Sequence, residues 1–153
     1  MYREILKGYC EEEKPKITVF ENKENYSEMI IDEGYFYSLC EHHLLPFFGK
    51  VFVAYIPDKK LIGISKLARI VDHYAAKLQV QERLTKQIAE YLNEVLKPKG
   101  VAVLMSARHL CRELRGVKKF GAIMTTSELL GQFREDARTR NEFMNLVQSK
   151  INN

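Results

Sequence analysis

The chain has 153 residues, of which 46% are hydrophobic and 29% are charged, a composition typical of a folded globular protein. We expect a single domain over residues 1–153, large enough to fold without disulfides. The net charge of +4 comes from 24 basic and 20 acidic residues. This balance is too mixed to favour nucleic acid as a partner.

The sequence also argues against a membrane or secreted protein. No apolar run approaches the roughly 20 residues of a membrane span, and the N-terminus has no apolar signal core. The three cysteines cannot all pair within one chain, which suggests a reducing compartment and possible metal or catalytic roles. We therefore expect a cytoplasmic protein with no membrane partner.

Hydrophobic periodicity and turn residues predict an α+β fold with a mostly antiparallel sheet. Runs rich in β-branched and aromatic residues predict strands over 17–22, 28–39, 47–57, 101–111 and 117–127. Helices are predicted over 2–9, from the capping residue Ser65 onward, over 81–96 and over 136–149. The sheet is not obviously closed, and joining the sheets of several subunits is one way to cover its edges.

The sharpest local feature is the run Cys40-Glu41-His42-His43. A thiolate and an imidazole three positions apart, as in Cys40 and His43, match the short ligand spacing of zinc sites. On its own this run is a moderate signal, because histidines in ordinary hydrogen bonds give the same pattern.

A second cluster, His109 and Cys111, lies near the end of a predicted strand. Side chains alternate along a strand, so these two residues are expected to share one face. Cys111 would then join Cys40 and His43 as a third ligand. Three protein ligands leave the fourth position of zinc for water, which is the arrangement of a catalytic site.

The remaining histidines, His42 and His109, are candidate proton-transfer groups because imidazole titrates near neutrality. Two alternatives stay open at this point. A structural zinc would need Cys10 or His42 as a fourth ligand. Alternatively, Cys111 is a buried cysteine that binds no metal.

Basic residues near the first central helix predict an anion site. Ser65 begins this helix, where free backbone N–H groups and the helix dipole favour an anion. Lys66 and Arg69 are spaced to reach one phosphate group, and Arg115 adds a cation close to Cys111 in sequence. Each of these cations is also explained by an ordinary solvated surface.

Glu82 lies at the start of the second central helix, next to Gln81. A carboxylate can accept two hydrogen bonds from a guanine-type edge, one from the ring N–H and one from the exocyclic amine. The simpler explanation for Glu82 is favourable interaction with the helix dipole.

The sequence resembles the zinc-dependent GTP cyclohydrolase I family over roughly residues 17–148. The matching stretches, in the right order, are SLCEHHLLPFFGKVFVAYIP, LIGISKLARIV, LQVQERLTKQIAEYL, HLCRELRGVKK and TTSELLGQFRED. The combination of CEHH, SKLARIV and QVQERLT is highly specific. The resemblance implies the tunnelling fold, an antiparallel sheet with two central helices on one face. It also implies a homodecamer of two pentamers, in which subunit sheets join into a barrel and active sites lie at subunit interfaces.

The resemblance further implies a reaction, in which GTP and water give 7,8-dihydroneopterin triphosphate and formate. This is the first step towards folate, biopterin-type cofactors or 7-deazaguanine nucleosides. The family's zinc ligands fall on Cys40, His43 and Cys111, and the zinc-activated water adds to carbon 8 of guanine. His109 falls on the residue that protonates the imidazole ring of guanine, and His42 on its catalytic companion.

The substrate contacts that the resemblance implies are carried over in the same way. Ser65 falls near the ribose, and Glu82 holds the guanine with Gln81 beside it. The residues that match the triphosphate grip are Lys66, Arg69 and Arg115.

Two other functions remain open: a related enzyme acting on a different guanine nucleotide, and a zinc-stabilised binding module without turnover. The module would need Cys10 as a ligand, whereas the cyclohydrolase would not. A nitrile reductase of the same fold is disfavoured by the presence of Cys40 and His43. Residues 1–9 resemble the end of a longer N-terminal helix whose basic residues help to hold the triphosphate, and we expect Arg108 to replace part of that charge.

Overall fold

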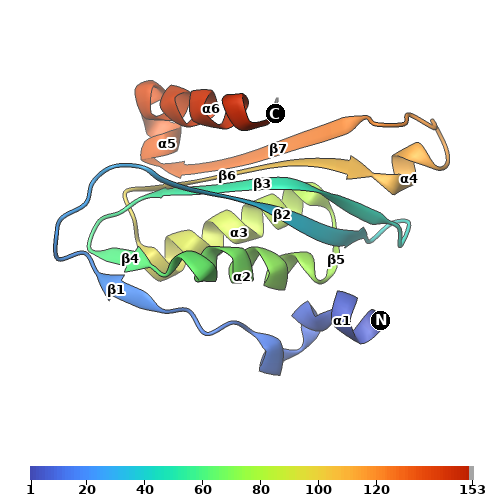
Figure 1. Cartoon of the computed structure of the whole chain (residues 1–153), viewed down its shortest axis with the longest axis horizontal. Coiled ribbons are helices and arrows are strands. Elements are labelled where there is room, and N and C mark those ends of the chain that lie inside the picture. Colours follow the sequence, from blue (N-terminus) through green and yellow to red (C-terminus); the bar gives the residue numbers. More distant parts are fainter. Residues whose placement is uncertain (152–153) are drawn as a thin grey trace.

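The computed structural model describes residues 1–151, so that residues 152–153 of the predicted domain lie outside the described part. Its centre is a five-stranded sheet in the order β5-β2-β3-β6-β7 (Figure 1). The strands are β2 (Ile30–Cys40), β3 (Pro46–Ile56), β5 (Leu78–Gln79), β6 (Gly100–His109) and β7 (Ile123–Gly131). All neighbours are antiparallel except β2 and β5. A separate ribbon pairs β1 (Val19–Glu21) with β4 (Lys60–Ile62).

Helices α2 (Ile64–Ala75) and α3 (Gln81–Leu96) cover one face of this sheet (Figure 1). Their buried residues recur at helical spacing, as the sequence predicts: Leu67, Ile70 and Val71 in α2, and Leu84, Ile88 and Leu92 in α3. Full burial of each such side chain contributes about 1.5–3 kcal/mol. The prediction of an α+β tunnelling fold, with two central helices on one face, is confirmed.

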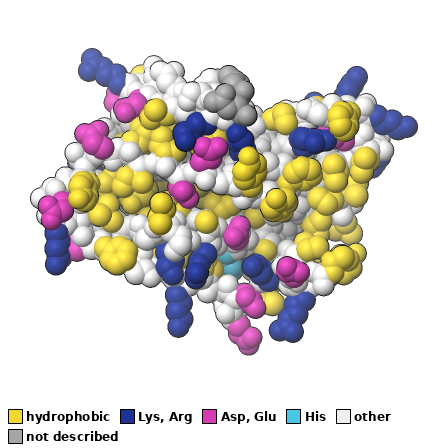
Figure 2. Space-filling view, viewed as in Figure 1, with side chains coloured by type: hydrophobic (Ala, Val, Ile, Leu, Met, Phe, Trp, Pro, Cys, Tyr) yellow, Lys and Arg dark blue, Asp and Glu magenta, His cyan; other side chains and the backbone are white. Residues whose placement is uncertain are grey.

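The opposite face carries α5 (Gln132–Glu135) and α6 (Ala137–Ile151) (Figure 1). Phe133 and Phe143 from these helices pack edge to face, with ring centroids 5.6 Å apart, on the second hydrophobic cluster of the chain. Tyr35, Tyr37 and Ile123 from the strands remain exposed. Figure 2 shows hydrophobic side chains gathered towards the end of the sheet that carries α4 (Leu110–Glu113).

The predicted N-terminal helix over residues 2–9 is wrong in length. It divides into α1 (Tyr2–Ile5) and a 3-10 turn (Lys7–Tyr9), which a further 3-10 turn (Glu11–Glu13) follows. Gly8 explains the break, because its N–H donates to Ala76 O at 2.9 Å, where the chain passes α2. A Cβ atom on Gly8 would lie 2.3 Å from the carbonyl oxygen of His73, so this close approach requires glycine.

Two strand predictions and one cap prediction are also wrong. The strand predicted over 101–111 ends at His109, where the chain turns into α4. The strand predicted over 117–127 begins only at Ile123, because Gly116, Lys118 and Gly121 have positive φ and interrupt an extended backbone. Helix α2 is preceded by Gly63 as its N-cap, so that Ser65 is the second helical residue and not the cap.

Within the described residues, none of the helices has the length and apolar character needed to span a bilayer.

Candidate metal centre

Cys40 and His43 are brought together by the turn between β2 and β3. Cys40 is the last residue of β2, and its N–H donates to Leu45 O at 2.9 Å. Leu44 has a φ of 55° and donates its N–H back to Cys40 O at 2.8 Å. This tight return places His43 Nδ1 3.6 Å from Cys40 Sγ.

Cys111 completes the cluster from α4. One ligand atom from each of Cys40, His43 and Cys111 can be chosen so that all three lie within 4.8 Å of one another. The prediction that Cys111 shares a strand face with His109 is wrong, since Cys111 lies in the helical turn after the strand. Residues from two distant segments nevertheless meet as the sequence predicts.

The donor set fits a zinc ion. Two thiols and one imidazole are ligands that zinc prefers, and three protein ligands leave a coordination position open. Burial raises the pKa of the Cys111 thiol, and the neighbouring Cys40 raises it further, while Arg115 opposes both. A bound cation would reverse this shift, because it stabilises the thiolate. Cys10 is exposed and does not belong to the cluster found among the described residues.

His109 precedes Cys111 by two residues, and contacts with two other residues fix the orientation of its ring. Its ring stacks on Phe47 with centroids 4.7 Å apart and an angle of 5° between the planes. Its Nε2 lies 2.8 Å from Gln81 Oε1. The Gln81 Nε2 donates to two backbone carbonyls, Met105 O and Met124 O, each at 3.1 Å.

These contacts decide where the His109 proton lies. A carbonyl can only accept, so the Gln81 amide nitrogen must face Met105 and Met124, and its oxygen must face the ring. His109 Nε2 therefore carries a hydrogen and donates it. Burial lowers the pKa of His109, and Arg112 lowers it further, while Glu82 opposes them. The favoured form is the neutral ring, with its lone pair on Nδ1.

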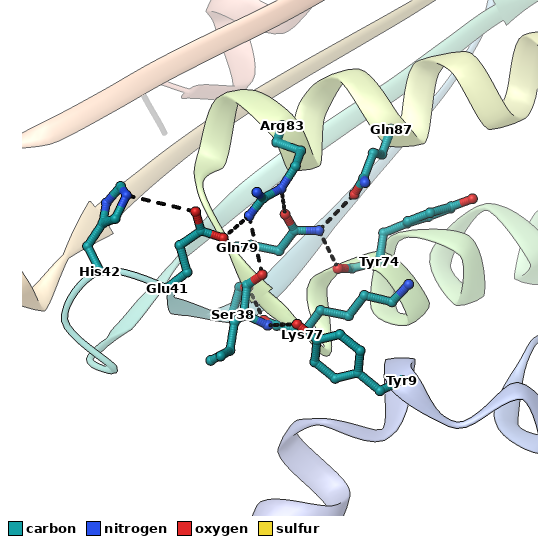
Figure 3. Close-up of polar contacts among 10 residues, drawn as sticks. Tyr9, Ser38, Glu41, His42, Tyr74, Lys77, Gln79, Arg83 and Gln87 are labelled. Carbon is teal, nitrogen blue, oxygen red and sulfur yellow. Dashed lines mark hydrogen bonds and ion pairs between the residues drawn. The ribbon is translucent and has the colours of Figure 1, made fainter.

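His42 is held differently, on the exposed side of the turn. Its Nε2 lies 3.8 Å from Glu41 Oε1, and Glu41 pairs with Arg83 of α3 (Figure 3). The Arg83 hydrogen bond holds the pKa of Glu41 below its usual value. Arg83 also donates to Gln79 Oε1 at 3.0 Å.

Sequence reasoning missed this network of Glu41, Arg83 and Gln79. The one available signal is that Glu41 and Arg83 each stand inside a recognised motif, next to a residue already chosen. Gln79 extends the network by donating to Tyr74 O at 2.9 Å and to Gln87 Oε1 at 2.8 Å (Figure 3). The β2–β3 turn is thereby tied to both central helices.

The other predicted substrate contacts fall into two groups. Glu82 and Arg115 are close enough to His109 and Cys111 to affect their ionisation. Glu82 raises the pKa of His109, and Arg115 lowers that of Cys111. The second group is in the first half of α2: Ser65, Lys66 and Arg69.

The start of α2 lies away from the metal cluster. A helix rises about 1.5 Å per residue, which puts Ser65 roughly 15 Å from Ala75 at the other end of α2. The Ala75 end leads into β5, which pairs with the Cys40 end of β2. One chain therefore does not bring Ser65 and Lys66 to the three ligands.

Arg108 lies on the opposite side of the sheet from His109. Neighbouring residues of a strand face opposite ways, and Arg108 is paired in register with Phe48, whereas His109 is paired with Phe47. The Arg108 guanidinium binds the carboxylate of Glu113 and holds the pKa of that group below its usual value. The structure therefore does not place Arg108 with the other predicted triphosphate contacts.

The sheet, its two helices and the three-ligand cluster define a tunnelling-fold protein with a site able to bind a metal ion. The model of the GTP cyclohydrolase I family matches residues 1–148. The chain belongs to the GTP cyclohydrolase I family.

Individual relatives agree with this family. The GTP cyclohydrolase 1 of Sulfurihydrogenibium sp. is 56% identical over 134 residues, which cover 87% of this chain and 72% of that relative. The GTP cyclohydrolase 1 of Alkalilimnicola ehrlichii is 51% identical over 148 residues, which cover 96% and 80%. Among solved structures, the archaeosine synthase QueF-Like in its apo form has a TM-score of 0.55 at 19% identity, over 67% of this chain and 93% of that one. At that identity, the likeness concerns the fold alone.

Proposed function

We propose that this chain is a zinc-dependent GTP cyclohydrolase I, which converts GTP and water into 7,8-dihydroneopterin triphosphate and formate. The observation that carries the proposal is the meeting of Cys40, His43 and Cys111 beside His109 in a chain of this family. The product would feed the synthesis of folate-type pterins or 7-deazaguanine nucleosides in the cytoplasm.

Cys40, His43 and Cys111 would hold the zinc ion. Zinc bound there would supply a water activated as a nucleophile near neutral pH, for attack on carbon 8 of guanine. Glu82, exposed at the first turn of α3, would accept hydrogen bonds from the ring N–H and exocyclic amine of guanine. This contact would fix the orientation of the base in the site.

His109 would exchange the proton with the imidazole ring of guanine. Since Gln81 holds the Nε2 hydrogen, the free Nδ1 is the atom available to take and return a proton. A direct contact of Gln81 with guanine stays a prediction. The Gln81 amide is bonded within the chain, and this contact would need one of those bonds to break. His42, with Glu41 to orient it, would act as the companion acid or base on the exposed side.

The triphosphate would be held across a subunit interface. Arg115 lies near the cluster of its own chain, whereas Ser65, Lys66 and Arg69 are at the far part of α2. A neighbouring subunit would bring its own α2 to the cluster, near the ribose and the phosphates. The exposed hydrophobic residues Tyr35 and Tyr37 support association of subunits, which in this family's fold would be a decamer of two pentamers.

A nucleotide panel tests the reaction against its nearest alternative. Zinc-loaded protein is incubated with GTP, GDP, GMP and dGTP, and formate is measured together with the fluorescence of the oxidised pterin. We expect formate and pterin from GTP in equal amounts, and lower kcat/KM for nucleotides with fewer phosphates. Preference for GMP or dGTP would support the related enzyme, and no turnover of any nucleotide by assembled, zinc-loaded protein would contradict both.

A further inference from the structure

An ion pair outside the metal cluster ties together the two ends of the segment that carries Cys111. Arg108 Nε donates to Glu113 Oε1 at 2.8 Å, and Arg108 Nη2 donates to Glu113 Oε2 at 2.6 Å. The Glu113 side chain is only 1% exposed, while that of Arg108 is 35% exposed. A two-pronged pair of this kind fixes both distance and angle between its partners.

Aromatic rings and the backbone hold the pair in place. The Arg108 guanidinium carbon lies 5.8 Å from the centroid of Phe48 and 5.1 Å from that of Phe120. The backbone of Gly121 also favours the charged carboxylate and helps to lower the pKa of Glu113. The pair thus joins β6, α4 and the loop that leads to β7, and its Arg108 side chain lies on the side of the sheet that faces away from His109.

Helix α4 needs such a tie because it is a single turn of four residues, Leu110–Glu113. One helical turn is not stable by itself, since nucleation fixes several dihedrals for one hydrogen bond. Its N-cap, His109, makes no side-chain capping bond. Arg108 stands directly before the cap and Glu113 is the last helical residue, so the pair closes the turn around Cys111.

We propose that the Arg108–Glu113 ion pair is a positioning device that holds Cys111 at the metal centre from the opposite face of the sheet. The proposal rests on the proposed function only in taking Cys111 as a metal ligand. Cys40 and His43 come from one tight turn and are placed by it, whereas Cys111 depends on α4. Without the pair, the third ligand would have to be ordered at each binding event, at a cost in metal affinity.

The test measures zinc affinity directly, by competition with a chromophoric chelator on the assembled 153-residue chain. Arg108→Met removes the pair, and Arg134→Met is the matched control, because Arg134 forms an exposed pair with Glu128 at the other end of β7. Cys111→Ser gives the affinity of a site that lacks its third thiolate. We expect Arg108→Met to bind zinc about 10- to 100-fold more weakly than wild type, and Arg134→Met to match wild type.

Cobalt(II) substitution gives a second measurement, which a loss of folding stability alone would not change. In Arg108→Met the visible ligand-field and thiolate bands are expected to shift towards those of Cys111→Ser. If Arg108→Met does not fold, the double variant Arg108→Met/Glu113→Leu removes the pair without leaving a buried charge, which favours folding. The same loss of zinc affinity is expected in the double variant.

Wild-type zinc affinity and a wild-type cobalt spectrum in either folded variant would overturn the proposal. Zinc binding by wild type without release of formate from GTP would contradict the proposed reaction alone. Failure of wild type to bind zinc would contradict both, because there would be no centre for the pair to position.

Discussion

Gln81→Met replaces a buried amide by an apolar side chain of similar length. Gln81 is 1% exposed. Its Nε2 lies within hydrogen-bond distance of Met105 O and Met124 O at 3.1 Å and of Thr126 Oγ1 at 3.0 Å, and its Oε1 accepts from His109 at 2.8 Å. Methionine can replace none of these bonds.

The size of the effect follows from the groups left behind. Two carbonyls and the His109 N–H lose this partner, and each unsatisfied buried group costs about 1–3 kcal/mol. Relaxation and entry of water reduce the sum, so that we expect Gln81→Met to lower the free energy of unfolding by about 3 kcal/mol. His109 would also lose its fixed orientation, and we expect kcat for GTP to fall by at least about 10-fold.

Urea unfolding followed by far-UV circular dichroism measures the stability loss, at one fixed protein concentration because association adds to stability. Gln87→Met is the matched control. It lies on the same helix, is half-buried, and accepts a hydrogen bond from Gln79 at 2.8 Å. We expect the control to lose about 1 kcal/mol. A loss in Gln81→Met no larger than in Gln87→Met would show that the buried amide of Gln81 contributes no more to stability than a half-buried one.

Three further predictions concern other parts of the chain. Cys10→Ser should keep the wild-type zinc content by metal analysis, because Cys10 lies outside the cluster; loss of zinc would favour a four-ligand structural site. Lys66→Ala and Cys111→Ser proteins should be inactive alone but regain formate release when unfolded and reassembled together, since the two positions lie apart within one chain; no recovery in mixed oligomers would contradict the shared site. Burial raises the pKa of Asp32 above 3.8, so its charged form disfavours the folded state. Below pH 3.8 the carboxyl is protonated in both states, so Asp32→Asn should match wild type in free energy of unfolding. As the pH rises through the folded pKa, the variant should become more stable than wild type. A stability advantage that shrinks with rising pH would contradict this expectation.

The parts of the fold that the sequence predicts best are those with one strong local period. The stripes in α2 and α3 repeat every three or four residues, and Leu67, Ile70, Leu84 and Ile88 are buried as expected. The start of β7 was misplaced because Val117 has strand propensity, whereas positive φ angles on either side of it keep it in a loop. Gly116 and Gly121 are a sequence signal of this break, because glycine readily adopts positive φ, whereas Lys118 gives no such signal.

The candidate site divides in the same way. Cys40 and His43 are found because their spacing is local, and Cys111 joins their cluster as predicted although it lies in α4 and not in a strand. The tie between Arg108 and Glu113 could not be predicted, because a strand that continued to residue 111 would not have brought these two side chains together. Their pairing depends on the turn of α4.

The most direct test of the account is a zinc titration of metal-free protein in the presence of GTP, with formate release as the signal. Activity should rise in proportion to zinc and level off at about one ion per chain, and Cys111→Ser should stay inactive over the same range. Absence of formate release from assembled wild type at full zinc occupancy, or wild-type activity in Cys111→Ser, would contradict it.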